Sequence, residues 1–521
     1  MRKRASAWSS VCAGCSPSHC GTELGVASCW PATGSASSLY IYHDHEKLVF
    51  GSEIKAILAY PELRPDLNPR ALEDYLAFGM VFGPQTIFRH VEKLPPGSVC
   101  VVEAGRLRPA PKCYWQLRFE PDERTTVAEW HEAIRAKVTE SVRLHLIADV
   151  PVGAFLSGGI DSGIVVASCA GATNGPLQTF SMGFPDETVS ELPFAREAAE
   201  RYGTTHTDQV VTPDSVSLLD DLSRFYDEPF ADSSAVPTFL VSKLAARQVK
   251  VVLSGDGGDE GFGGYSRYAH DLKEAALRRR LPGPLRGFLG PVGRCWPKAD
   301  WLPRPLRLKT LLTNLSLAPG TAYANTLQSC RLPLRRHLLH ADVVAQLDGH
   351  DPAARVAAAF GTSGDPLANM IAADVGTLLP DDYLVKVDRA SMACGLEVRP
   401  PLLDHELLEL SARIPSRLKI RRGQTKWILK EAFRDRLPES TLRRPKQGFE
   451  IPVNAWLRGP LRSRFRDEIL GSGSRLEGLI DRGVASELFR RHESGRGQHG
   501  QTLWALLVLS AWARRYLHSG R

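Results

Sequence analysis

Residues 152–168 read Val-Gly-Ala-Phe-Leu-Ser-Gly-Gly-Ile-Asp-Ser-Gly-Ile-Val-Val-Ala-Ser, and this stretch decides the fold. Its apolar start, residues 152–156, has the length of one buried strand. Residues 157–159 (Ser-Gly-Gly) follow, and after Asp161 and Ser162 an apolar run suits a helix. Such a turn binds anions, because glycines allow close approach and the first N–H groups of a helix are free. Asp161 would repel a bare phosphate, so we expect Mg²⁺ between this carboxylate and the phosphate.

Ser-Gly-Gly alone would equally suit an ordinary strand-to-helix turn. The full pattern Ser-Gly-Gly-x-Asp-Ser after an apolar strand is more specific. It resembles the pyrophosphate-binding loop of ATP pyrophosphatases, the enzymes that split ATP into AMP and pyrophosphate. It is not a Walker loop, because no Gly-Lys-Ser/Thr follows.

Further strands alternate with helices after this loop. Residues 177–184, 206–211 and 249–255 read as strands, and residues 191–202 read as a helix. This alternation predicts an α/β domain with a doubly wound parallel sheet, in which ligands bind at the carboxyl ends of the strands. We therefore expect the adenine and ribose between three strand ends; these ends carry Leu156, Met182 and Ser254. Simple core packing would explain Met182 as well.

A second motif, Ser-Gly-Asp-Gly-Gly-Asp-Glu, spans residues 254–260. Carboxylates on a glycine-rich loop suit a hard cation, although a solvated acidic turn is the alternative. We assign Asp259, together with Asp161, to Mg²⁺. We assign Asp256 to the reacting centre, where it would assist acyl-adenylate formation or take a proton from the attacking amine.

Two further clusters of charge lie closer to the C-terminus. In residues 382–404 we single out Lys386, Glu397 and Arg399 as candidates, although surface ion pairs would explain them equally well. Lys426 opens a predicted helix, where the helix dipole disfavours a cation, and a bound triphosphate would supply the counter-charge. Residues 444–449 add a basic turn.

Together these clusters resemble the synthetase domain of asparagine synthetases, over about residues 125–515. The resemblance implies an adenine nucleotide α-hydrolase-like fold of the ATP-pyrophosphatase type. It also implies that aspartate is converted by ATP to β-aspartyl-AMP and that ammonia then displaces AMP. Asp256 and Lys426 would be catalytic, and the ATP site would comprise Leu156, Ser157, Gly158, Gly159, Asp161, Ser162, Met182, Ser254 and Gly255. Glu450 departs from the family, which usually has a small residue there.

Residues 38–118 resemble the C-terminal half of the glutaminase domain of glutamine-dependent asparagine synthetases, an α+β domain. The matching pieces are residues 50–56, 75–79, 86–89 and 93–97. In that family a catalytic Cys begins the mature chain, but this sequence has no Met-Cys-Gly start and lacks the loops that hold glutamine. We therefore expect ammonia-dependent synthesis without glutaminase activity. We also expect the apolar strands 39–42 and 99–102 to lack a facing layer, which would leave this region loose.

Residues 1–37 differ in composition from the rest of the chain. Ser, Cys, Gly and Ala dominate, and no hydrophobic period is visible. Regrouped one base earlier with permitted codons, residues 15–22 and 28–35 can read as phrases that the family carries just before the strand at Leu39. We interpret the segment as an out-of-frame reading. The alternative is a zinc module, whose ligands would come from Cys12, Cys15, His19, Cys20 and Cys29.

Composition sets further limits. The 521 residues carry a net charge of +7, and we interpret the scattered arginine runs 278–280, 335–336 and 443–444 as solvated faces, so we expect no nucleic-acid partner. The longest apolar stretch, residues 502–513, is too short for a membrane span and predicts a buried helix. Without an apolar segment after the basic start we expect a cytoplasmic enzyme. Its partners would be aspartate, ATP and ammonia or glutamine, and a homodimer is compatible with the sequence. Adenylation of another acid and a catalytically impaired pseudoenzyme are the competing hypotheses.

Overall fold

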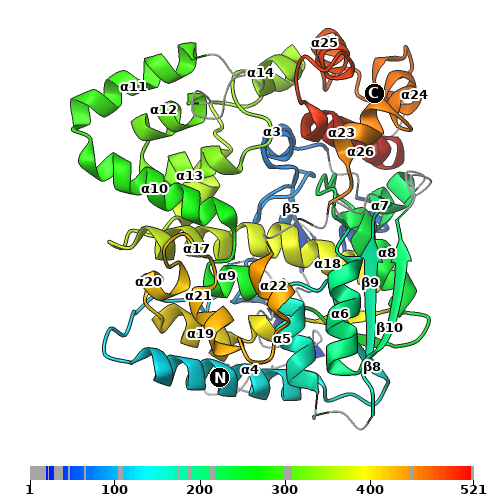
Figure 1. Ribbon diagram of the computed structural model, residues 1–521. Helices are drawn as coiled ribbons and strands as arrows, with labels where there is room; N and C mark the ends of the chain where they lie inside the picture. Colours follow the sequence, from blue (N-terminus) through cyan, green and yellow to red (C-terminus); the bar gives the residue numbers. More distant parts are fainter. Residues whose placement is uncertain are drawn as a thin grey trace.

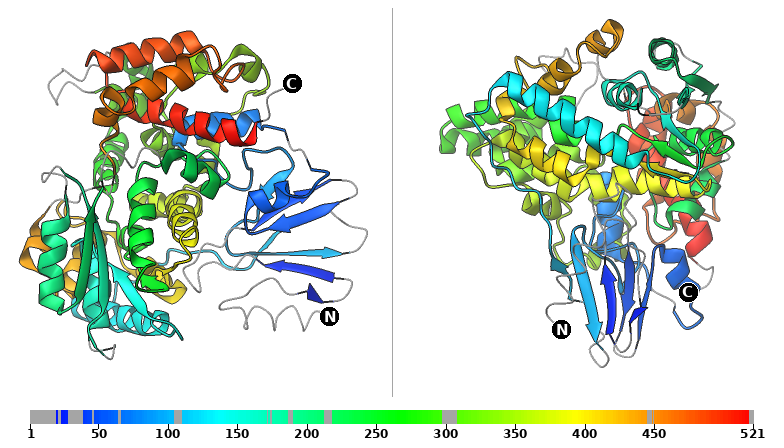
Figure 2. Two further views of the ribbon diagram at one scale, coloured as in Figure 1. Left: turned by 90° about the vertical axis from the view of Figure 1, so that its right-hand side faces the viewer. Right: turned by 90° about the horizontal axis from the view of Figure 1, so that it is seen from below.

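The computed structural model describes the backbone of residues 19–20 and 23–27 and, with side chains, most of the chain from residue 39. The described ranges are 39–44, 47–63, 66–103 (the side chain of 103 excepted), 110–170, 172, 175–185, 190–211, 218–296, 308–444, 448 and 450–517. Two small antiparallel sheets from the N-terminal region stand on one side of the molecule, away from a larger parallel sheet (Figure 2).

The parallel sheet has five strands in the order β10-β9-β8-β11-β12. They are β8 Val152–Phe155, β9 Gln178–Gly183, β10 Thr205–Val210, β11 Val251–Leu253 and β12 Glu397–Arg399. Every neighbouring pair is parallel, which confirms the predicted doubly wound α/β fold. From β8 the chain adds β9 and β10 on one side, and it then adds β11 and β12 on the other side of β8. The strand order therefore reverses between β8 and β11. Ligands of such sheets bind at this switch point, beyond the carboxyl ends of the strands.

Helices cover both faces of the sheet (Figure 1). On one face α4 Val127–His145, α5 Ile160–Cys169 and α6 Leu192–Tyr202 share a hydrophobic core with β8. On the other, α7 Leu218–Tyr226, α8 Ala235–Ala245 and α18 Leu384–Met392 pack in the main core. Val252 and Leu253 are neighbours in β11 and enter different cores, because successive strand residues point to opposite faces.

Two antiparallel sheets form the N-terminal region and face each other. One has the order β4-β3-β5, and the other has the order β1-β2-β6-β7. Leu39 and Ile41 pack against Cys100 and Val102 in a small core of their own. The expectation of an uncovered layer is therefore wrong for these side chains, because each sheet covers the other. The strands are β1 His19–Cys20, β2 Glu23–Ala27, β3 Tyr40–His43, β4 Leu48–Gly51, β5 Val91–Lys93, β6 Ser98–Glu103 and β7 Lys112–Cys113.

Two helices join this region to the rest of the molecule. They are α2 Ile54–Leu58 and α3 Pro69–Phe78, and α3 lies beside the C-terminal helix α26 Gly500–Tyr516 (Figure 2). The Tyr75 hydroxyl donates to the Ala505 carbonyl at 2.6 Å. Asn68 caps α3 by accepting from the Arg70 N–H at 3.1 Å. Glu53 occupies the N-cap position of α2.

The remaining helices surround these layers, and α26 is the buried helix that the apolar stretch predicted. None of the helices in the described ranges is long and apolar enough to cross a membrane. They are α9 Gly258–Phe262, α10 Ser266–Arg280, α11 Gly283–Cys295, α12 Lys309–Ser316, α13 Pro319–Leu327, α14 Leu334–Leu338, α15 Ala341–Ala345, α16 Ala353–Ala359, α17 Pro366–Gly376, α19 His405–Arg413, α20 Ser416–Lys419, α21 Trp427–Ala432, α22 Glu439–Arg443, α23 Val453–Arg458, α24 Arg462–Phe465 and α25 Arg482–Glu493. A π-helical turn η3 Leu379–Tyr383 precedes α18, a 3₁₀ turn η4 Pro401–Leu403 precedes α19, and a π-helical turn η5 Arg466–Leu470 follows α24.

The expectation of solvated arginine runs holds for Arg279, Arg280 and Arg443, which are exposed, but not for Arg278 and Arg335. Arg335 is fully buried, with its Nε 3.3 Å from Glu73 Oε1, and Arg278 is buried with its Nη2 2.8 Å from Glu274 Oε1. Each buried guanidinium faces a buried carboxylate from α3 or α10, so part of the basic excess stabilises the interior.

Candidate active site

The loop between β8 and α5 is held in a shape that requires glycine. Gly158 has a φ of +68°, and a Cβ there would lie 2.4 Å from the carbonyl carbon of Phe194. The carbonyl of Gly158 accepts a hydrogen bond from Thr441 Oγ1 at 3.1 Å. The Ser162 hydroxyl accepts from the Ser157 N–H at 3.2 Å. The loop is therefore fixed from both sides, with the N-terminus of α5 directly after it.

The loop after β11 packs directly against this first loop. A Cβ on Gly255 would lie 2.7 Å from the backbone nitrogen of Ser162, and one on Gly258 would lie 2.1 Å from Asp161 Oδ1. Both loops leave the carboxyl ends of adjacent strands, so the sheet itself brings them together at the switch point. The glycines of the acidic motif are needed for this close approach.

Lys426 lies between the two carboxylates that we assigned to a metal. Its Nζ is 2.7 Å from Asp259 Oδ1 and also contacts Asp161 Oδ2. Burial lowers the pKa of Lys426, but attraction by Asp161 and Asp259 outweighs burial and raises it above its usual value. Lys426 is the N-cap residue of α21, has a φ of +53° and is only 4% exposed. Three candidates from distant parts of the sequence thus meet at one point.

The two carboxylates suit a divalent cation only in combination with other oxygen ligands. The described ranges contain no group of three or more His, Cys, Asp or Glu side chains placed to hold a metal. Asp161 and Asp259 nevertheless point at a common position, where the Lys426 Nζ lies. Gly264 leaves room beside it, because a Cβ added to Gly264 would lie only 1.9 Å from Asp259 Oδ1. Mg²⁺ is commonly bound by one or two carboxylates plus substrate phosphates and water, so the donor set fits Mg²⁺ with a nucleotide.

A second charged cluster adjoins these loops. Asp256 is half-buried and accepts a hydrogen bond from Ser254 Oγ at 2.7 Å. Burial raises the pKa of Asp256, while the Ser254 hydrogen bond and the Lys386 charge oppose that rise. Lys386 Nζ lies 2.9 Å from Asp232 Oδ2, and burial together with repulsion from Asp232 raises the pKa of Asp382 well above its usual value. Asp256 therefore faces a cluster with an acidic excess.

Sequence reasoning gave Asp232 and Asp382 no role. Asp232 begins an Asp-Ser-Ser segment, and its Oδ1 accepts from the Ser234 N–H at 2.8 Å and from the Ser234 hydroxyl at 2.7 Å. The Asp-Ser-Ser sequence could have identified Asp232 as a candidate, because a carboxylate that accepts hydrogen bonds from the neighbouring backbone is ordered before any ligand binds. Glu450, the residue that departs from the family, is exposed and lies near the charges of Asp232 and Lys386.

Two of the predicted candidates, Glu397 and Arg399, make contacts with the end of a helix. The Arg399 guanidinium pairs with Glu397 at 2.7 Å and donates to the carbonyls of His145 and Ile147 at 3.0 and 2.8 Å. These two residues therefore hold β12 to the C-terminal end of α4. Their place among the site candidates stays a prediction, since both side chains point toward that helix end.

The apolar candidates lie where we expected, at strand ends, but their side chains are core residues. Leu156 is 1% exposed and Met182 is 3% exposed, and they belong to opposite faces of the sheet. Their backbone groups remain candidates for nucleotide binding. The Met182 side chain is packed in the core, as the alternative explanation stated.

Arg444 is a further cation beside the first loop. Its Nη2 pairs with Glu191, its guanidinium carbon lies 4.6 Å from the Phe194 ring centroid, and a Cβ on Gly159 would lie 3.8 Å from Nη2. Arg444 begins the basic turn that we noted in the sequence. Residues 445–447 and 449 of that turn lie outside the described residues.

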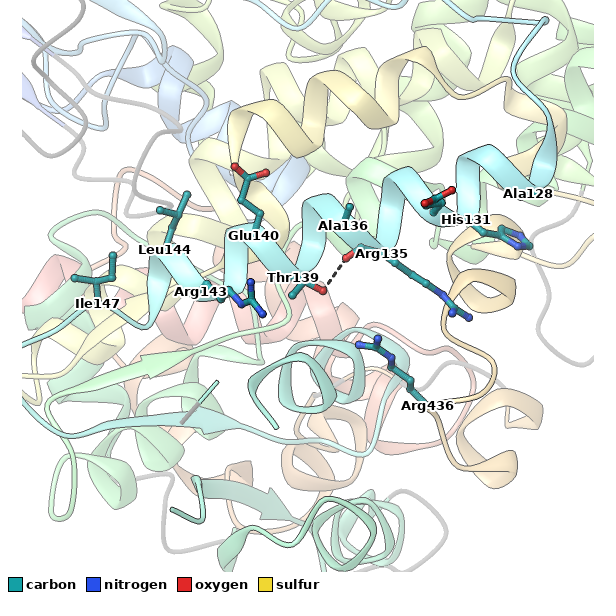
Figure 3. Close-up of a pocket in the computed structure, with 11 residues that line it drawn as sticks. Ala128, His131, Arg135, Ala136, Thr139, Glu140, Arg143, Leu144, Ile147 and Arg436 are labelled. Carbon is teal, nitrogen blue, oxygen red and sulfur yellow. Dashed lines mark hydrogen bonds between the residues drawn. The ribbon is translucent and has the colours of Figure 1, made fainter. Parts of the chain in front are cut away.

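A cavity of about 930 Å³ lies along the outward face of α4, apart from these loops (Figure 3). Arg135, Arg143 and Arg436 line it together with the exposed Leu144 and Ile147. None of the candidate catalytic or nucleotide-binding residues lines this cavity. The site at the switch point is therefore defined by its side chains and not by this cavity.

The parallel sheet, with a Ser-Gly-Gly-x-Asp-Ser loop and an acidic loop meeting at its switch point, defines an α/β domain of the ATP-pyrophosphatase type. The family model described as "Asparagine synthase" matches residues 133–514, and the one described as "Glutamine amidotransferase domain" matches residues 34–115. The chain belongs to the asparagine synthetase family, whose members are ATP-using ligases that form carbon–nitrogen bonds.

Similar proteins agree with this assignment. "Putative asparagine synthetase [glutamine-hydrolyzing]" of Mycobacterium tuberculosis (strain ATCC 25618 / H37Rv) is 35% identical over 475 residues, which cover 88% of this chain and 70% of the relative. "Asparagine synthetase [glutamine-hydrolyzing] 1" of Bacillus subtilis (strain 168) is 30% identical over 476 residues, or 91% and 73% of the two chains. "Amidase chyE" of Penicillium rubens (strain ATCC 28089 / DSM 1075 / NRRL 1951 / Wisconsin 54-1255) is 25% identical over 499 residues, or 86% and 71%.

Proposed function

We propose that the chain converts aspartate to asparagine through β-aspartyl-AMP, with ammonia as the nitrogen donor. The observation that carries the proposal is the convergence of the anion-binding loop, two carboxylates and Lys426 at the switch point, beside Asp256. A phosphate site next to a carboxylate with a raised pKa suits adenylation of an acid followed by transfer to an amine. The proposal also places the enzyme in the cytoplasm.

The first step is nucleotidyl transfer, in which the side-chain carboxylate of aspartate attacks the α-phosphorus of ATP and the bond to the β-phosphate oxygen breaks. The Gly158 N–H and the N-terminus of α5 would hold the leaving pyrophosphate. Lys426, kept charged by its neighbours, would leave its carboxylate partners for the phosphate oxygens as negative charge grows there. Asp161 and Asp259 would hold Mg²⁺, which supplies charge neutralisation at the phosphates when bound.

The second step is amide formation. The ammonia nitrogen attacks the acyl carbon, AMP leaves with the bonding electron pair, and the excess proton passes to a base. Asp256 is the candidate base, because burial raises its pKa and Ser254 fixes its orientation. Lys386 supplies positive charge among Asp232, Asp382 and Asp256, so that an anionic acid substrate can approach.

The cysteines of the described N-terminal region support ammonia as the nitrogen source. Within the described N-terminal region, burial raises the pKa of the Cys100 thiol, which disfavours the nucleophilic thiolate, and the Cys113 thiol donates to the Trp115 carbonyl at 3.2 Å. The out-of-frame origin of residues 1–37 stays a prediction, because most of that segment lies outside the described residues. A nucleotide sequence without the family phrases in the shifted frame would contradict it.

The test is asparagine, AMP and pyrophosphate formation from aspartate, ATP and Mg²⁺, with ammonia and glutamine supplied separately. We expect stoichiometric products with ammonia and no glutamate release from glutamine. Lys426→Met should slow pyrophosphate release by roughly 100-fold, the usual effect of losing one charge-stabilising group. Lys250→Met is the matched control, because Lys250 is exposed next to β11 and should leave the rate unchanged.

Other outcomes separate the alternatives. Pyrophosphate release with another carboxylic acid but not with aspartate would contradict aspartate as the substrate. It would favour a related enzyme that amidates another acid, an alternative that the similarity to an amidase makes worth testing. Absence of release with every acid in a panel would contradict the enzyme proposal and favour a catalytically impaired protein. Glutamate release from glutamine would contradict ammonia dependence alone.

A further inference from the structure

A buried ion cluster joins the N-terminal region to the parallel-sheet domain. Lys93 ends β5 and is 7% exposed, and its Nζ lies 3.1 Å from Glu228 Oε2 and 3.3 Å from Asp381 Oδ1. The same Nζ donates to the Val81 carbonyl at 2.6 Å. Lys93 comes from the region that matches an amidotransferase, whereas both carboxylates come from the synthetase domain.

Backbone groups of the N-terminal region hold the other oxygen of each carboxylate. The Gly83 N–H donates to Asp381 Oδ2 at 2.8 Å, and the Ile87 N–H donates to Glu228 Oε1 at 2.7 Å. Burial opposes the charge on Lys93, but attraction by Asp381 and Glu228 outweighs it and raises the pKa of the lysine. Removing the lysine would leave two carboxylates buried without their counter-charge, which costs far more than losing an exposed pair.

The two clamped carboxylates belong to the segments that carry the second charged cluster of the site. Asp381 directly precedes Asp382 in η3, and that turn continues into α18 with Lys386. Glu228 lies four residues before Asp232, the partner of Lys386 at 2.9 Å. One lysine side chain therefore holds both the helix that presents Lys386 and the loop that presents Asp232.

A second contact holds the same helix nearer its C-terminal end. Arg389 Nη1 lies 2.8 Å from Glu53 Oε1, and Arg389 Nη2 donates to the Ser52 carbonyl at 2.7 Å. The Arg389 guanidinium carbon also lies 5.6 Å from the Tyr40 ring centroid. The start of α18 is thus held through Lys93 and its end through Arg389, and both anchors lie in the N-terminal region.

We propose that Lys93 is a positioning residue for the synthetase reaction. By fixing Asp381 and Glu228 it sets the relative position of Lys386, Asp232 and Asp382, and so the N-terminal region serves the synthetase site without hydrolysing glutamine. This inference rests on the proposed function. It assigns the region a role that does not depend on a glutaminase nucleophile.

The test compares Lys93→Met and Lys93→Arg with the control Lys47→Met in the full chain. Lys47 belongs to the same region but pairs with exposed Glu62 away from the interface. We expect Lys93→Met to lower kcat for aspartate-dependent pyrophosphate release and to raise the KM for aspartate, together by about tenfold or more, as loss of a buried charge partner does. The KM for ATP should change less than about twofold, since Lys93 does not touch the phosphate loop. Lys93→Arg should recover much of the loss, and Lys47→Met should match the wild type.

A second measurement does not depend on catalysis. Hydrogen–deuterium exchange should rise in residues 228–234 and 379–392 of Lys93→Met, and not in Lys47→Met. If Lys93→Met does not fold, the triple variant Lys93→Met/Glu228→Gln/Asp381→Asn removes the uncompensated charges. A folded triple variant with wild-type turnover and exchange would overturn the inference. Wild-type protein without aspartate-dependent turnover, but with the expected exchange difference, would contradict the proposed function and leave the clamp supported.

Discussion

Replacing Asp271 by Asn should make the protein more stable at pH 8 and leave its stability almost unchanged near pH 4. Asp271 lies in α10 and is 8% exposed, and within the described part of the molecule neither of its carboxylate oxygens has a hydrogen-bond partner. Burial and repulsion from Glu274 and Asp374 raise its pKa from 3.8 to about 7, against the opposing charges of Arg267 and Arg278. The folded protein therefore holds a proton on this carboxyl that the unfolded chain releases.

The magnitude follows from that difference in pKa. One pKa unit corresponds to about 1.4 kcal/mol, so a rise from 3.8 to about 7 corresponds to about 4 kcal/mol. Because the folded pKa is raised, the stability contributed by the protonated group is complete below the unfolded pKa and is lost as the pH rises toward 7. The amide of Asp271→Asn would stay neutral at every pH, so the advantage of the variant should grow by about 1.4 kcal/mol per pH unit between pH 4 and 7 and then remain constant.

The assay is urea unfolding followed by tryptophan fluorescence at pH 4.5, 6, 7 and 8. The control is Asp342→Asn, since the Asp342 side chain is 82% exposed and the same chemical change there should have little effect on the pH dependence. A stability difference between Asp271→Asn and wild type that does not change with pH would refute the reasoning. So would a variant that is less stable than the wild type at pH 8.

Three further changes test other parts of the structure. Gly158→Ala should reduce pyrophosphate release strongly and cost on the order of 1–3 kcal/mol of stability, because its Cβ would clash with the Phe194 backbone at a φ of +68°; equal melting temperature and activity would show that the loop relaxes. Asp374→Ala should lower the free energy of unfolding by about 3–5 kcal/mol, because it leaves the largely buried Arg267, now 2.6 Å from Asp374 Oδ2, without its counter-charge; urea unfolding measures this, and a loss below about 1 kcal/mol would count against it. Arg444→Met should raise the KM for ATP by roughly tenfold or more, because it leaves the Glu191 carboxylate uncompensated beside the phosphate loop; an unchanged KM in steady-state kinetics would place Arg444 outside the site.

Local patterns in the sequence predicted the elements and the two loops that meet at the switch point. Trp130, Ile134, Val138 and Val142 recur every four residues, a spacing typical of an amphipathic helix, and all four side chains are buried on α4. The alternation of strands and helices predicted the parallel sheet, whose switch point then places the loops after β8 and β11 side by side. These predictions succeed because hydrophobic period and glycine placement act over a few residues, and the geometry of a parallel sheet adds the rest.

Only the tertiary structure decided which distant charges meet. Lys386 and Asp232 are 154 positions apart in the sequence, and Lys93 and Asp381 are 288 apart, yet both pairs are in direct contact. Arg335 was expected at the surface because a charged side chain is usually solvated, but Glu73 from a distant helix makes its complete burial tolerable. A residue type predicts the cost of burying a charge, whereas the fold alone determines whether a partner is present to offset that cost.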